Sequence, residues 1–262
     1  MRAAVAILLA SVVSTGARAQ DPVAVYAAGS LREVLTEVAG LWQAQGGTRP
    51  ALTFGASGLL RERIEQGEPA QVFASADMEH PQRLAATGHW QPPAVFTRNA
   101  LCALAAPHVE ATPGALLAML LRNDVRVGTS TPRADPSGDY AWALFRKADA
   151  VQPGAHAALD AKALKLTGGA DSPKPPPGRG TYAWVMEQGQ ADIFLTYCTN
   201  AVAAQRELPR LKVVQVPPEL QVDAAYGLTV RHGASTAARD FAAFLLSRPA
   251  QAAFARLGFE AP

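Results

Sequence analysis

Three consecutive segments repeat the order strand, short turn, helix, and this repeat constrains the fold more than any other feature. Apolar runs predict strands at residues 23–28, 51–55 and 72–75. Each run is followed by small or polar residues and then by a helical pattern, at residues 31–43, 59–66 and 81–86. Because parallel strands are joined by crossovers that usually contain a helix, the repeat predicts a parallel α/β sheet.

A second set of elements follows a strand-like run at residues 96–105. The patterns predict further helices at residues 113–121, 136–145, 181–188, 236–246 and 249–257. Further strands are expected at residues 125–128, 193–197, 211–216 and 226–230. Two such sets without a flexible linker predict an α/β protein of two lobes, each a mixed sheet flanked by helices.

The composition excludes several classes of protein. Lys and Arg total 24 against 22 Asp and Glu, a formal net charge of +2, whereas a nucleic-acid-binding protein shows a basic surplus. No Cys or His spacing indicates a metal site, and no glycine-rich phosphate or dinucleotide motif is present in the sequence. We therefore expect no nucleic-acid partner, no cofactor and no bound metal cation.

The first residues have the pattern of a secretory signal peptide. Arg2 precedes an apolar run at residues 3–13, and Ala17-Arg18-Ala19 fits the small-residue cleavage site. The run is shorter than the roughly 20 apolar residues that span a bilayer, and a fortuitous Ala-rich helix is the alternative. We expect cleavage after Ala19, a periplasmic protein and equal numbers of acidic and basic residues in the mature chain.

Three serines stand between an expected strand and the helix that follows it: Ser30, Ser57 and Ser137. Helix N-termini offer unpaired N–H donors and the positive end of the helix dipole, so serines at converging helix starts can bind an anion. Serine is also a favoured helix N-cap. The spacing alone leaves both interpretations open.

Longer motifs resemble a known family. Residues 27–31 (AAGSL), 54–59 (FGASGL) and 67–77 (GEPAQVFASAD) are similar to the molybdate-binding proteins of ABC transporters. The resemblance continues through residues 98–101, 135–141 and 192–197 and so covers essentially the whole mature chain. It implies a periplasmic substrate-binding protein, a monomer that delivers its ligand to a membrane permease.

The same resemblance implies the ligand and its site. The family binds a tetrahedral oxyanion, molybdate or tungstate, between two lobes through hydroxyls and backbone N–H groups. The matching positions are Ser30, Ser57, Ser137, Arg179 and Tyr197. Lobe 1 is expected to take residues 20–102 and 222–262, and lobe 2 residues 103–221.

Arg179 departs from the family pattern, which has an apolar residue that contributes only its backbone. A guanidinium at that position predicts either a cation beside the cleft or a solvated residue of the proline-rich loop at residues 171–180. A cation there would favour another inorganic anion, or a small organic one, as the ligand.

An enzymatic function is the alternative from another class. Residues 55–59 (GASGL) miss the G-x-S-x-G motif of serine hydrolases at the last position. The histidines show no metal-ligand spacing and no evident triad partner. We therefore expect a protein that is not an enzyme, with a secreted serine hydrolase as the lesser alternative.

The molybdate-binding pattern does not require the two cysteines. Cys102 lies in the strand expected at the first crossover between lobes, and Cys198 directly follows Tyr197. An exported chain with two cysteines tends to join them, which predicts a Cys102–Cys198 disulfide within lobe 2. Two separate buried thiols are the alternative.

Overall fold

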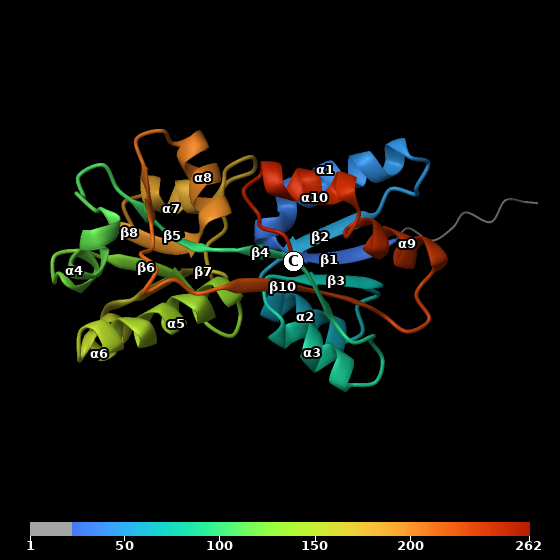
Figure 1. Cartoon of the computed structure of the whole chain (residues 1–262), viewed down its shortest axis with the longest axis horizontal. Helices are drawn as coiled ribbons and strands as arrows, with labels where there is room; N and C mark the ends of the chain where they lie inside the picture. The colour runs from blue at the N-terminus through green and yellow to red at the C-terminus, as the bar shows by residue number, and fades with distance from the viewer. Residues whose placement is uncertain (1–22) are drawn as a thin grey trace, which may run out of the picture.

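The computed structural model describes residues 23–262, which form two lobes side by side along the longest axis of the molecule (Figure 1). Each lobe contains a five-stranded mixed sheet with helices on both faces. The predicted two-lobe α/β fold is therefore confirmed. The predicted signal peptide at residues 1–19 lies outside the described residues, and no helix within residues 23–262 is long and apolar enough to span a membrane.

The sheet of lobe 1 has the strand order β2-β1-β3-β10-β4. Strand β1 pairs in parallel with β2 and β3, as the repeated units predict, and β10 pairs antiparallel with β3 and β4. The strands are β1 (Ala24–Ala28), β2 (Ala51–Gly55), β3 (Val72–Ser75), β4 (Ala94–Asn99) and β10 (Ala224–Val230).

Helices bury both faces of this sheet, which explains why β1 reads as a continuous apolar run. Val25 packs in the core under α1, α9 and α10, whereas Tyr26 faces Leu60 of α2 on the opposite side. The helical elements of lobe 1 are η1 (Gly29–Leu31), α1 (Arg32–Ala44), α2 (Ser57–Glu65), α3 (Glu79–Ala86), α9 (Thr236–Phe244) and α10 (Arg248–Arg256).

Lobe 2 has the strand order β7-β6-β8-β5-β9, again with parallel and antiparallel pairs. Its strands are β5 (Leu101–Ala105), β6 (Val127–Ser130), β7 (Leu164–Thr167), β8 (Ile193–Tyr197) and β9 (Lys212–Gln215). Its helical elements are η2 (Pro113–Ala115), α4 (Leu116–Leu121), α5 (Pro136–Val151), α6 (Ala155–Lys162), α7 (Thr181–Glu187) and α8 (Cys198–Glu207).

The chain crosses between the lobes at Ala100 and again between β9 and β10. The strand-like run at residues 96–105, in which the first crossover was expected, is divided into two strands, because β4 ends at Asn99 in one sheet and β5 begins at Leu101 in the other. The first lobe boundary also moves, since Leu101 and Cys102 pair with β8 of lobe 2. An apolar run does not indicate which sheet each half will join.

Candidate functional site

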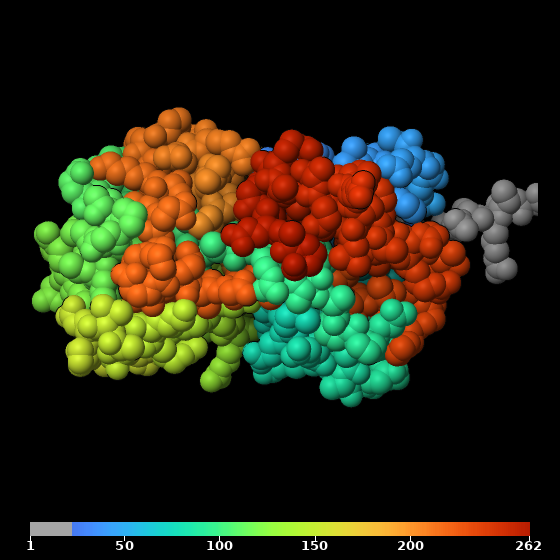
Figure 2. Space-filling view, in the orientation of Figure 1, coloured from blue at the N-terminus to red at the C-terminus, as the bar shows by residue number. Residues whose placement is uncertain are grey.

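The two lobes meet along the middle of the molecule, where α5 of lobe 2 lies beside α2 and α3 of lobe 1 (Figures 1 and 2). The backbone N–H of Gly58 in α2 donates a hydrogen bond to the carbonyl of Ala134 across this interface at 2.8 Å. A Cβ atom on Gly58 would lie 2.2 Å from the carbonyl oxygen of Arg133. Only glycine therefore allows the lobes to approach this closely.

Ser57 and Tyr197 come from different lobes and contact the same residue. The backbone N–H of Ala76 donates to Ser57 Oγ at 3.1 Å, and the Tyr197 hydroxyl donates to the carbonyl of Ala76 at 3.3 Å. Ser57 is 1% exposed and Tyr197 is also buried. These two predicted site residues are thus brought together at the end of β3.

Ser30 joins the same group of residues through an aromatic side chain. Its hydroxyl lies 3.0 Å from the hydroxyl of Tyr226, whose ring centroid is 5.4 Å from that of Tyr197. Tyr140 packs on Tyr197 from α5, with ring centroids 6.1 Å apart. Burial raises the pKa of all three tyrosines, so their hydroxyls keep the protons that make them donors at neutral pH.

Ser137 lies in the first turn of α5, one turn before Tyr140. Its hydroxyl is fully buried and has no hydrogen-bond partner among the described residues. The cap of α5 is Asp135, whose carboxylate accepts the Ser137 backbone N–H at 3.0 Å. Burial raises the pKa of Asp135 to about 6. The Ser137 side chain is therefore not needed as a helix cap.

Arg179 lies apart from the group around Tyr197 and is held within lobe 2. Its guanidinium donates to Glu207 and Glu187, each at 2.6 Å, and among residues 23–262 it forms no other side-chain hydrogen bond or ion pair. Two carboxylates thus neutralise the guanidinium of Arg179, which was one candidate for a cation beside the cleft.

A polar cavity of about 540 Å³ opens between the lobes beside α2 and α5. Lobe 1 contributes side chains from α2 and α3, and lobe 2 contributes the loop before α5 and its first turn. The lining residues are Arg61, Glu62, Glu79, His80, Arg83, Pro132, Arg133, Ala134 and Asp139. Neither this cavity nor the role of Tyr226 is predictable from the sequence, because no motif indicates which loops the tertiary structure brings together.

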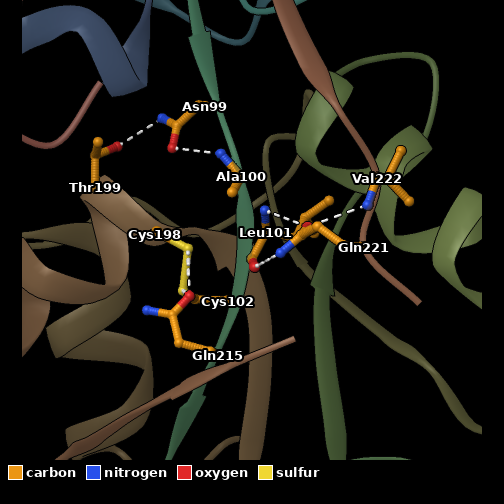
Figure 3. Close-up of a disulfide and its surroundings, with 9 residues drawn as sticks. All are labelled: Asn99, Ala100, Leu101, Cys102, Cys198, Thr199, Gln215, Gln221 and Val222. Atoms are coloured by element: carbon orange, nitrogen blue, oxygen red, sulfur yellow. Dashed lines mark hydrogen bonds between the residues drawn. A yellow bond between two sulfur atoms is a disulfide. The ribbon is translucent and has the colours of Figure 1, made fainter. Parts of the chain in front are cut away.

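The disulfide between Cys102 and Cys198 is present, as predicted (Figure 3). It joins β5 to the first turn of α8 directly after Tyr197. Next to it, the Asn99 side chain accepts the backbone N–H of Ala100 and donates to Thr199 Oγ1, both at 2.9 Å. The bridge and this amide together fix the backbone at the first crossover.

The second crossover is tied to the first by one glutamine. The Leu101 N–H donates to Gln221 Oε1 at 3.1 Å, and Gln221 Nε2 donates to the carbonyl of Leu101 at 3.0 Å (Figure 3). The two chain segments that connect the lobes are therefore held together as one hinge.

The chain forms two α/β lobes that are joined by a paired hinge. Helix starts and buried hydroxyls face each other across the interface between the lobes. These features define a two-lobe solute-binding protein. The sequence profile of the family described as bacterial extracellular solute-binding protein matches residues 23–260. The chain belongs to this family. Its members are transport proteins and not enzymes, so the serine hydrolase alternative is set aside.

Individual relatives agree with this assignment. An uncharacterized protein of Pasteurella multocida is 38% identical over 209 residues, which cover 78% of this chain and 85% of that protein. The periplasmic molybdate-binding protein of Azotobacter vinelandii has a TM-score of 0.72 at 19% identity, covering 92% of this chain and 99% of that one. The sulfate-binding protein SubI of Mycobacterium tuberculosis has a TM-score of 0.72 at 22% identity, covering 91% and 86%. At these identities the solved structures establish the fold alone.

Proposed function

We propose that this chain is the periplasmic binding protein of an ABC importer and that it binds a tetrahedral oxyanion between its lobes. The observation that carries the proposal is the buried hydroxyl of Ser137, which has no hydrogen-bond partner among the described residues. A buried polar group without a partner is costly, and an oxyanion oxygen would accept a hydrogen bond from this hydroxyl. The resemblance to molybdate-binding proteins makes molybdate and tungstate the first ligands to test.

The neighbouring groups supply further neutral donors for such an anion. The Ser57 hydroxyl accepts the N–H of Ala76 and keeps its own proton for a ligand at the start of α2. The Tyr197 hydroxyl donates to the Ala76 carbonyl and would exchange this bond for one to the anion. Hydrogen bonds to a charged acceptor are roughly twice as strong as bonds between neutral groups. The anion is therefore held without a bound cation, and selection between molybdate and sulfate depends on the size of the site.

Closure of the lobes couples ligand binding to transport. Ser57 belongs to lobe 1, whereas Ser137 and Tyr197 belong to lobe 2, so an anion between them contacts both lobes. A ligand that contacts both lobes shifts the equilibrium toward the closed form. The membrane permease then recognises the closed, loaded protein and receives the ligand.

Calorimetry of the ligand-free exported protein with molybdate, tungstate, sulfate and phosphate tests this function. We expect micromolar or tighter binding of molybdate and tungstate, and weaker binding of the smaller sulfate. An absence of binding heat with all four anions contradicts the proposal. Stronger binding of sulfate or phosphate than of molybdate keeps the oxyanion site but corrects the ligand.

A further inference from the structure

The backbone of Arg133 is held in a conformation that side-chain-bearing residues rarely adopt. Its φ of 68° is the only positive value at a non-glycine position within residues 23–262. Both carboxylate oxygens of Asp139 accept its N–H, at 3.0 and 3.1 Å, and Gly58 leaves room for its carbonyl. Strain that is maintained by specific neighbours is a mark of a functional position.

The Arg133 side chain is exposed and lines the interlobe cavity. Its guanidinium forms no hydrogen bond or ion pair with any described residue. The other two arginines of the lining are paired within lobe 1, Arg61 with Glu65 and Arg83 with Glu79, each at 2.5 Å. Among the described residues, Arg133 is therefore the lining arginine whose guanidinium has no ion pair, in contrast to Arg179, and the Asp139 carboxylate that accepts its backbone N–H lines the same cavity.

Neighbouring residues connect the cavity to the helix starts of the proposed oxyanion site, whose serines are not part of the lining. Gly58, which packs on the Arg133 carbonyl, directly follows Ser57, and Asp139 lies in the same helical turn as Ser137. A volume of about 540 Å³ falls within the range of pockets that hold small organic ligands. His80 adds a buried ring to the lining, 4% exposed, whose nitrogens form no hydrogen bond with the described residues and whose Nε2 lies 3.8 Å from the Asp77 carboxylate.

We propose that the cavity is a second subsite in which Arg133 binds a carboxylate of the ligand, while the tetrahedral oxyanion of the same molecule lies at Ser57 and Ser137. The ligand class is then a short organic anion that carries both groups. This inference rests on the proposed oxyanion site and extends it. A guanidinium suits the role, because its planar donors engage a carboxylate in two parallel hydrogen bonds.

Paired probes test the subsite: inorganic phosphate, and phosphoglycolate, which adds one carboxylate to a phosphate. Calorimetry compares the wild-type protein with Arg133→Gly, in which the left-handed backbone is retained because glycine adopts it freely. We expect the wild type to bind phosphoglycolate at least about tenfold more tightly than phosphate, as one charge-assisted pair contributes. Arg133→Gly should lose this preference, and Arg133→Lys should recover part of it.

The matched control is Arg122→Ala, which removes an equal charge from an exposed ion pair with Asp124 in lobe 2. It should keep the preference for phosphoglycolate. The subsite is overturned if phosphoglycolate binds no more tightly than phosphate, if Arg133→Gly weakens both probes equally, or if Arg122→Ala has the same effect. Tight molybdate binding together with any of these results leaves the oxyanion site standing, whereas a wild type that binds no anion removes both proposals.

Discussion

Serines begin helices in two parts of the molecule, and they make different contacts there. At the starts of α9 and α10, Ser235 and Ser247 act as N-caps and accept backbone N–H groups of their own helices. Ser57 begins α2 between the lobes but accepts an N–H from Ala76, which directly follows β3. Ser137 lies in α5, whose cap is Asp135.

A serine at a helix start can therefore serve the fold or bind a ligand. The hydrogen-bond partner of its hydroxyl distinguishes these two roles, whereas its position before a helix does not. A serine that caps a helix stabilises the fold and has its lone pair engaged. A serine whose helix is capped by another group keeps its hydroxyl available for binding a ligand. The predictions below test this contrast between groups that stabilise the fold and groups that bind, from the largest expected effect to the smallest.

The disulfide should have the largest effect on the free energy of unfolding, although it lies beside Tyr197. Replacing Cys102 and Cys198 together by serine should lower the free energy of unfolding by about 4 kcal/mol, since the bridge closes a loop with a sequence separation of 96. Denaturant unfolding measures the change, and thiol titration of the denatured, unreduced wild type should find no free thiol. A loss below about 1 kcal/mol contradicts this expectation. Anion affinity should also weaken, because the bridge fixes the backbone that carries Tyr197.

Gly58→Ala should separate binding from stability most clearly. The new Cβ would lie 2.2 Å from the Arg133 carbonyl oxygen, so the lobes cannot close fully. We expect anion affinity to fall about 100-fold or more, because closure brings the donors of both lobes to the ligand. Calorimetry measures the affinity, and Gly40→Ala is the control, since a Cβ there meets nothing within 4 Å. Unchanged affinity in Gly58→Ala would show that closure at this contact is not required.

Substitution of the cleft serines tests the comparison directly. Ser57→Ala and Ser137→Ala should each weaken anion binding by about 10- to 100-fold. Ser137→Ala should change the unfolding free energy of the ligand-free protein by no more than about 1 kcal/mol, whereas Ser57→Ala should lower it by about 1–3 kcal/mol because the buried Ala76 N–H loses its acceptor. Ser235→Ala should do the reverse, destabilising the protein by about 1 kcal/mol through the lost cap without affecting binding. If Ser57→Ala and Ser137→Ala instead mainly destabilise the protein, the serines serve the fold and the proposed site is wrong.

Asp135 caps α5 but lowers the stability of the protein when its carboxyl group is ionised, because burial raises the pKa of this group from 3.8 to about 6. Between these values the folded chain holds a proton that the unfolded chain releases, so stability should fall as the pH rises from about 4 to above 6. After allowance for partial solvent access, the fall should be about 1–2 kcal/mol. Asp135→Asn keeps a good cap and should reduce this pH dependence. Equal slopes for wild type and variant in unfolding experiments at pH 4.5 and 7.5 would assign the dependence to other groups.

Local patterns predicted much of the fold, because strands and helices with strong periodicity depend mainly on their own residues. The strand expected at residues 51–55 corresponds to β2 and that at 72–75 to β3. Elements with weak periodicity were not predicted: α6, the edge strand β7 and α8, which begins directly after β8 without a turn. Their formation depends on packing within lobe 2 rather than on local sequence.

The sequence by itself determined most of the order of elements and the two-lobe class, since these follow from local pattern, and it predicted the pairing of its two cysteines, which the structure contains. Tertiary structure alone decided which charges and hydroxyls are free. It splits one apolar run between two sheets at Ala100, pairs Arg179 with two glutamates and leaves the Arg133 guanidinium without an ion pair among residues 23–262. Whether a polar group is satisfied depends on residues that are distant in the chain, and their approach is fixed only when both lobes have packed.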